Sequence, residues 1–167
     1  MNNMDEPKTR IAIVGVGNLL LKDEGIGIHI VRALQQRDIP PDIKIIDGGT
    51  SPDLPYYLNS TDKLVIIDAV KGGSKPGTVY RFHPHDIDIE SGETVSAHEL
   101  GLEKSLEMMK LMENQPRETT IIGVEPKEIG WGTELSAELQ HKVPEIVNII
   151  LKEINLQQDN RIPSSQE

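Results

Sequence analysis

Apolar residues along this chain follow two alternating patterns. Short runs rich in Ile, Val and Leu predict strands at residues 11–14, 43–46, 64–67 and 119–124, and TVYRF at residues 78–82 looks like another strand. Between these runs, apolar residues recur at helical spacing and predict helices around residues 26–34 and 102–112. A longer stripe over residues 135–154 predicts a third helix, which Pro144 should kink or restart.

The alternation of strands with helices predicts the fold class. It is typical of an α/β protein, here a three-layer α/β/α sandwich around a mainly parallel sheet of about five strands. The strand segments are continuous apolar runs, as in strands that are buried on both faces. We expect a single domain at residues 1–155, and a loose tail at residues 156–167, which are polar and aperiodic.

The composition excludes several classes of function. Asp and Glu number 27 against 17 Lys and Arg, and the formal net charge of −10 argues against a general nucleic-acid binder. The chain has no cysteine, which excludes disulfides, zinc–thiolate sites and cysteine nucleophiles. No apolar stretch approaches the ~18 residues of a membrane-spanning helix. The N-terminal residues lack the apolar segment of a signal peptide, so we expect a cytoplasmic location.

The segment IAIVGVGNLLLKDEGIG at residues 11–27 is the most informative part of the chain. An apolar run leads through a glycine-rich turn and an acidic pair into a helix, a form shared by nucleotide-binding turns and metal-ligand turns. In the dinucleotide fingerprint G-x-G-x-x-G the third glycine would fall at position 20, which is Leu20. Binding of NAD or a flavin is therefore disfavoured, although Asp47 ends the second strand, where a ribose-binding acid would lie.

Three acidic residues stand where an α/β fold places either ligands or helix ends. Asp23 could cap the first helix, with Glu24 in its first turn, and acids are favourable there without any further function. Asp68 follows a buried strand, at the carboxyl edge of the sheet where open α/β folds bind ligands. Capping of a turn is the structural alternative for Asp68.

Histidines supply the remaining candidates for chemistry. Ser96 and Glu99 have the spacing of a capping box, which places His98 in the first turn of a helix. The positive helix end disfavours imidazolium and keeps the ring neutral and able to bind metal, unless His98 is simply an exposed histidine. His83 and His85 follow a strand and leave open either a second metal site or two ordinary loop residues.

Six motifs, taken in order, resemble those of the hydrogenase maturation endopeptidases, which trim the large subunit of nickel–iron hydrogenases. The resemblance runs from Arg10 to about Ile154. The motifs are GVGNLLLKDEGIG at 15–27, DGGT at 47–50, IIDA at 66–69, PGT at 76–78, SAHELGL at 96–102 and GVEP at 123–126. No single motif is decisive, but six in this order with matching intervals are highly specific.

The resemblance implies both a site and a substrate. The nickel-contacting residues of the family fall on Glu24, Asp68 and His98, and Asp68 or Glu24 could also act as general base. The implied substrate is a hydrogenase large-subunit precursor that already carries iron and nickel, cut just beyond its last metal-binding motif. The nickel is expected to arrive in the precursor, where it could mark metal loading, polarise the scissile carbonyl or activate water.

The turn after the second strand is the candidate for substrate contact. Asp47, Gly48, Gly49 and Thr50 end a strand at the presumed ligand edge. Two other classes of function stay open: a nickel metallochaperone without protease activity that uses the same three residues, and a nucleotide-binding oxidoreductase. Tight nickel binding without any precursor would favour the chaperone, and cleavage of a nickel-loaded precursor would favour the protease.

Overall fold

The computed structural model describes residues 10–50, 61–86, 107–111 and 115–159. The five expected strands are all present: β1 (Ile11–Gly15), β2 (Ile43–Asp47), β3 (Lys63–Ala69), β4 (Val79–Phe82) and β5 (Glu118–Val124). Four of them extend slightly beyond the apolar run that predicts them, whereas β4 begins one residue later than expected.

The strands form one sheet in the order β2-β1-β3-β5-β4. Among the described strands β4 is the antiparallel one, so the expectation of a mainly parallel sheet of about five strands is confirmed. A short turn returns the chain at the edge where β3 ends, and β4 therefore runs backwards and pairs with β5. The carboxyl ends of the four parallel strands meet at one edge, where Gly15 lies opposite Asp47 and Asp68 opposite Gly123.

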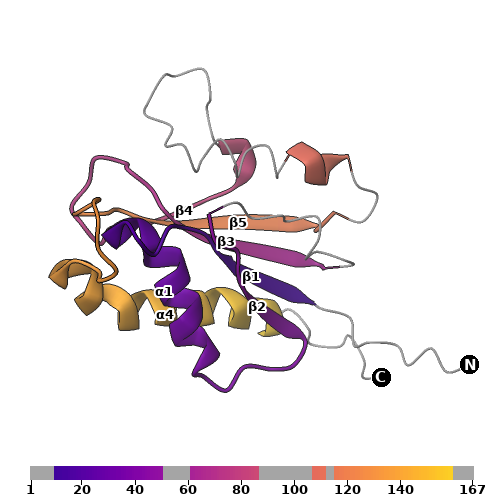
Figure 1. Cartoon of the computed structure of the whole chain (residues 1–167). Helices are drawn as coiled ribbons and strands as arrows, with labels where there is room; N and C mark the ends of the chain where they lie inside the picture. The colour runs from indigo at the N-terminus through magenta and orange to yellow at the C-terminus, as the bar shows by residue number, and fades with distance from the viewer. Residues whose placement is uncertain (1–9, 51–60, 87–106, 112–114, 160–167) are drawn as a thin grey trace, which may run out of the picture.

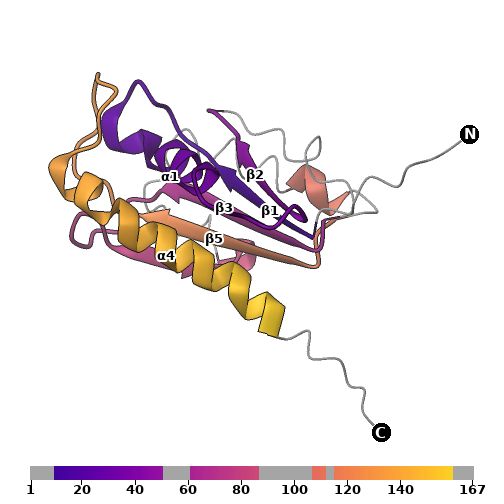
Figure 2. The same cartoon turned by 90° about the horizontal axis from the view of Figure 1, so that it is seen from below.

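Helical segments lie on both faces of this sheet and give the expected three layers. Helices α1 (Ile26–Gln35) and α4 (Ala137–Asp159) lie together on one face, as Figure 1 and Figure 2 show. The opposite face packs against Met109, in a helical turn at residues 107–110. The buried apolar side chains of the α1 and α4 face include Ile13, Val65, Ile67, Ile122, Ile30, Leu34, Ile146 and Ile150. Strands β1 and β3, in the interior of the sheet, are buried along their whole length, as expected for strands covered on both faces.

Helix α4 runs without interruption through Pro144. The expectation that this proline restarts the helix is wrong. A proline inside a helix removes one backbone hydrogen bond and costs about 3 kcal/mol. Burial of Leu139, Ile146, Ile150 and Ile154 along the same helix offsets that cost, since each fully buried aliphatic side chain contributes roughly 2 kcal/mol.

A buried ion cluster fixes α4 to the amino edge of the sheet, away from the carboxyl ends of the parallel strands. Glu153 of α4 is 2.8 Å from Lys63 Nζ in β3 and accepts two hydrogen bonds from the guanidinium of Arg81 in β4, at 2.8 and 3.0 Å. The hydrogen bonds from Arg81 outweigh burial and, with Lys63, lower the pKa of Glu153 to about 2. Glu153 therefore stays ionised inside the fold at neutral pH.

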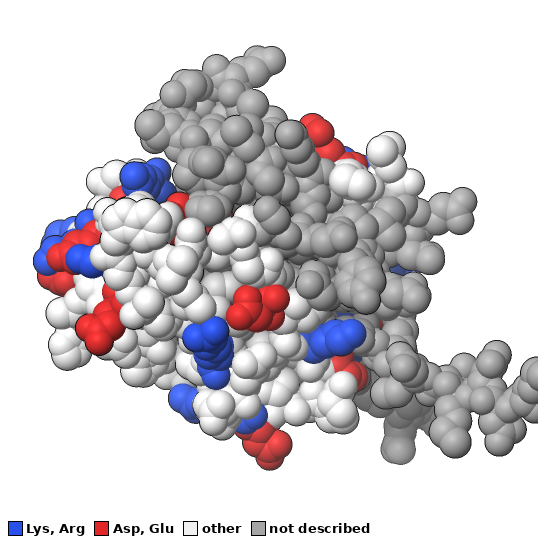
Figure 3. Space-filling view, in the orientation of Figure 1, with Lys and Arg blue, Asp and Glu red and all other residues white. Residues whose placement is uncertain are grey.

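The described surface carries charged side chains of both signs (Figure 3). On the face shown in Figure 3, positive and negative side chains of the described residues are interspersed. In the described part of the chain, none of the helices combines the length and the apolar character needed to cross a membrane.

Candidate active site

Backbone hydrogen bonds bring three motifs side by side at the carboxyl edge of the sheet. Val16 N–H donates to the Ile67 carbonyl of β3 at 2.8 Å. Gly17 N–H donates to the Gly49 carbonyl at 3.0 Å, and Gly48 N–H donates to the Gly15 carbonyl at 2.8 Å. The glycine turn after β1 therefore lies between Asp68 on one side and the turn at residues 47–50 on the other.

The glycines of this turn allow close packing of backbone on backbone. Gly17 has a φ of 154°, and a Cβ there would lie 2.1 Å from the carbonyl oxygen of Glu24. A Cβ on Gly27, in the first turn of α1, would lie 2.3 Å from the carbonyl oxygen of Ile67. A side chain at Gly17 would push Glu24 away from the glycine turn, and a side chain at Gly27 would push the start of α1 away from β3.

Asp68 and Glu24 are held at this edge on neighbouring elements. Asp68 is the penultimate residue of β3, is 2% exposed, and accepts the Ala69 N–H at 2.8 Å through Oδ1. Glu24 lies in the 3₁₀ helix η1 (Lys22–Gly25), is partly buried, and its backbone carbonyl accepts the Asn18 N–H at 3.3 Å. Because η1 packs against β3, the two predicted carboxylates share one edge of the sheet.

The third predicted nickel contact, His98, lies outside the described residues, as do Ser96 and Glu99 of its proposed capping box. Within the described ranges, no cluster of three or more His, Cys, Asp or Glu side chains could hold a metal ion. Convergence of Glu24, Asp68 and His98 therefore stays a prediction.

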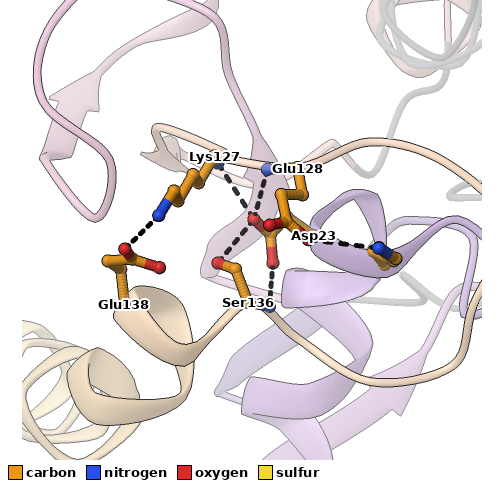
Figure 4. Close-up of polar contacts among 6 residues, drawn as sticks. Asp23, Lys127, Glu128, Ser136 and Glu138 are labelled. Atoms are coloured by element: carbon orange, nitrogen blue, oxygen red, sulfur yellow. Dashed lines mark hydrogen bonds and ion pairs between the residues drawn. The ribbon is translucent and has the colours of Figure 1, made fainter.

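Asp23 does not cap helix α1, and that expectation is wrong. The N-cap position is Gly25, which makes no side-chain capping bond. Asp23 is instead fully buried and binds the loop that follows β5, as Figure 4 shows. Its Oδ2 accepts the N–H groups of Lys127 and Glu128 at 2.9 and 2.8 Å. Ser136 donates its hydroxyl to Oδ2 and its N–H to Oδ1, both at 2.7 Å.

These bonds decide the charge state of Asp23. Burial by itself raises the pKa of a carboxyl group, and it is the largest single influence here. The hydrogen bonds from Glu128, Ser136 and Lys127 together outweigh burial, and the pKa of Asp23 is lowered. Asp23 therefore stays ionised as an acceptor for four donors and holds the segment before Glu24 against the 127–136 loop.

The predicted substrate-contact turn is open to solvent. Asp47 Oδ1 accepts the Gly49 N–H at 3.0 Å, which folds the turn on itself. Asp47 and Thr50 are exposed, and Gly48 and Gly49 are partly exposed. Backbone groups of an extended peptide could reach this turn from outside.

Glu125, in the GVEP motif, is a residue that sequence reasoning missed. It is 7% exposed and accepts the N–H groups of Gly72 and Gly73 at 2.6 and 3.3 Å and the hydroxyl of Tyr80 at 2.7 Å. These contacts organise the turn between β3 and β4, directly after Asp68. The sequence could have suggested this role, because a glutamate follows an apolar strand and the N–H groups of a glycine pair elsewhere in the chain need acceptors.

His83 and His85 lie at the other end of the sheet, near the start of β5. His83 Nδ1 donates to the Thr119 carbonyl at 3.0 Å. The two imidazole rings are stacked with centroids 5.5 Å apart and planes inclined by 7°. Nearly parallel stacked rings do not direct their nitrogens at one metal ion, so this geometry favours the interpretation as loop residues.

Comparison with known proteins identifies relatives of the chain. The family model for hydrogenase maturation protease matches residues 28–153. The hydrogenase 2 maturation protease of Escherichia coli K12 is 38% identical over 123 residues, covering 72% of this chain and 75% of the relative. The structure of the maturating endopeptidase HybD from E. coli has a TM-score of 0.79 at 31% identity, covering 89% of this chain and 93% of that chain. HybD from Thermococcus kodakarensis has a TM-score of 0.73 at 33% identity, covering 86% and 97%.

The three-layer fold and its acidic carboxyl edge, taken with these matches, define a peptide-bond hydrolase of the α/β class. The chain belongs to the hydrogenase maturation protease family. This result favours the protease over the nucleotide-binding oxidoreductase. The matched region of the family model includes Asp68 and His98 but begins after Glu24.

Proposed function

We propose that this protein removes a C-terminal peptide from the nickel-loaded precursor of a nickel–iron hydrogenase large subunit. The observation that carries the proposal is the placement of Glu24 and Asp68 at one edge of the sheet in a member of the maturation protease family. The E. coli relative is named a hydrogenase 2 maturation protease. We place the reaction in the cytoplasm, as expected from the sequence.

Glu24, Asp68 and His98 are our candidates for contact with the nickel of the precursor. Two carboxylates and a neutral imidazole are donors that suit nickel and leave positions for water or substrate. Within the described residues no three such side chains come together, and we propose His98 as the third donor. The nickel belongs to the substrate, and the protease recognises whether it is present.

Hydrolysis also needs a base for the attacking water, and Asp68 and Glu24 are both candidates. The Ala69 N–H bond to Oδ1 orients the Asp68 carboxylate at the edge of the sheet. The base takes a proton from water, the water oxygen attacks the scissile carbonyl carbon, and the proton then goes to the leaving amine. The nickel of the precursor would supply polarisation of the carbonyl or of the water.

The turn formed by Asp47, Gly48, Gly49 and Thr50 is our candidate for contact with the peptide being cut. It is exposed, and it is joined to the glycine turn through the Gly17–Gly49 and Gly48–Gly15 hydrogen bonds. A peptide that lies along it would pass the segment leading to Glu24.

Incubation with nickel-loaded and nickel-free precursor tests the proposal. We expect mass spectrometry to show loss of a C-terminal peptide from the loaded precursor alone. Tight nickel binding by the isolated protein, with no mass loss from either precursor, would instead indicate the metallochaperone.

A further inference from the structure

The single tryptophan of the chain lies on the surface, beside other exposed apolar residues. Trp131 is 83% exposed, Leu20 is 54% exposed and Ile129 is 42% exposed. In the described part of the chain, large exposed apolar side chains are found at five positions, and these three lie on two adjacent segments. We call Leu20, Ile129 and Trp131 the Trp131 patch. Clustering of this kind indicates an interaction surface rather than scattered surface apolar residues.

The backbone under the Trp131 patch is cross-linked. Gly132 N–H donates to the Leu20 carbonyl at 2.9 Å, and Lys22 N–H donates to the Gly132 carbonyl at 2.8 Å, which forms a short parallel bridge. The buried carboxylate of Asp23 holds the same loop through Lys127, Glu128 and Ser136 (Figure 4). A loop that is fixed by so many bonds keeps its backbone in one arrangement, which lowers the entropy lost on binding.

Charged side chains around the patch are paired with one another. Lys22 Nζ lies 3.1 Å from Glu128, and Lys127 pairs with Glu138. An apolar centre with a rim of polar groups is the anatomy of a protein–protein interface. Tryptophan is also among the residues that contribute most binding energy at such interfaces.

The position of the patch indicates which partner covers it. Gly132 pairs with Leu21, and Leu21 precedes Glu24 by three residues, roughly 6 Å along a 3₁₀ helix. A protein that binds with a standard interface covers about 800 Å² of its partner, a disc of roughly 16 Å radius. A folded protein that brings its scissile bond to the edge carrying Glu24 would therefore also cover the Trp131 patch.

We propose that the Trp131 patch is the docking surface for the hydrogenase large-subunit precursor and contacts an apolar area on the folded part of that protein. This inference rests on the proposed function. It assigns precursor affinity to Trp131, Leu20 and Ile129, apart from the carboxylates that carry out the chemistry.

Single-turnover cleavage of nickel-loaded precursor over a range of protease concentrations tests the docking surface. Trp131→Ala should raise the half-saturating protease concentration by roughly tenfold or more and leave the maximal rate within about twofold. Leu111→Ala is a matched control because Leu111 is 87% exposed and directly follows the helical turn at residues 107–110, whose Met109 packs on the other face of the sheet. It should change neither quantity. Unchanged melting of both variants would show that the fold is intact.

Binding of precursor, measured separately by pull-down, distinguishes the possible failures. Wild-type protein that neither binds nor cleaves the loaded precursor would overturn the proposed function and the docking surface with it. If the wild type binds or cleaves and Trp131→Ala does so with unchanged half-saturation, the docking surface alone is wrong. A wild-type dimer in sedimentation analysis that becomes monomeric in Trp131→Ala would assign the patch to a second copy of this chain and also overturn the proposal.

Discussion

Asp23 holds Ser136, 113 residues away in the chain, by two hydrogen bonds of 2.7 Å. One bond comes from the Ser136 backbone N–H and the other from its hydroxyl. Glu24, which follows Asp23 in the chain, contributes its carboxylate to the proposed active site. The acidic pair of the first motif therefore divides into a structural residue and a candidate functional residue.

Asp23→Asn should destabilise the fold. The amide can retain one acceptor oxygen, but its NH₂ group would face buried N–H donors, and we expect a loss of about 3 kcal/mol in the free energy of unfolding. Urea unfolding followed by circular dichroism measures this. Glu24→Gln is the matched comparison: its stability should change by about 1 kcal/mol or less while precursor cleavage is lost. Wild-type stability of Asp23→Asn would contradict the role of Asp23 as a buried acceptor.

The strands could be predicted from sequence because most of them are β-branched apolar runs bounded by turn residues. Their order in space could not be predicted in the same way, since the pattern in residues 119–124 does not show that β5 lies between β3 and β4. Pro144 shows the limit of a local rule, because the burial of α4 against the sheet overrides the preference of proline to end a helix.

At the candidate site, too, local sequence rules predict only part of the arrangement. Asp68 could be placed at the carboxyl edge because a parallel sheet brings its strand ends together there. Asp23 could not be separated from a helix cap, because its partners Lys127 and Ser136 are more than a hundred residues further along the chain. Glu125 was recognised as part of a motif, but its role depends on Tyr80 and on the turn between β3 and β4.

Glu125→Gln should loosen the turn that follows Asp68. The variant loses a charged acceptor for two N–H groups and a hydroxyl, and we expect a stability loss of about 2 kcal/mol. Tyr80→Phe removes one of these bonds and should cost about 1 kcal/mol. Denaturant unfolding of both single variants and of the double variant measures their coupling. Purely additive losses would show that the Tyr80–Glu125 bond contributes nothing of its own.

Glu153→Gln should make stability less dependent on pH. A carboxyl with a pKa of about 2 when folded and 4.5 when unfolded contributes stability above pH 4.5 and loses it as the pH falls toward 2. The full contribution is on the order of 3 kcal/mol. The variant should therefore be less stable than wild type at pH 7, and the gap should narrow below pH 4.5. Glu145 lies on the exposed side of α4, and Glu145→Gln is the control: its curve of unfolding free energy against pH should run parallel to that of wild type. A difference between Glu153→Gln and wild type that stays constant with pH would show that the pKa of Glu153 is not lowered.

His98→Gln should weaken cleavage of nickel-loaded precursor more than it weakens folding. Glutamine can still form hydrogen bonds early in a helix, so the predicted capping box of Ser96 and Glu99 should survive. It lacks the imidazole nitrogen that nickel prefers. Cleavage rate and melting temperature, measured on the same preparation, separate the two effects. Normal cleavage with a clearly lowered melting temperature would show that His98 has a structural role and does not bind the nickel.

Asp68→Asn should abolish or strongly slow precursor cleavage while the fold stays intact. The substitution is nearly isosteric, and the amide oxygen can still accept the Ala69 N–H that Asp68 Oδ1 now accepts at 2.8 Å. What it removes is the negative charge required either to contact nickel or to take a proton from water. Single-turnover cleavage with saturating variant, together with a melting curve, separates chemistry from stability. The proposed site predicts a loss of at least about a hundredfold in rate, since general-base catalysis contributes ~10²–10⁴-fold; a wild-type rate would show that Asp68 only shapes the turn after β3.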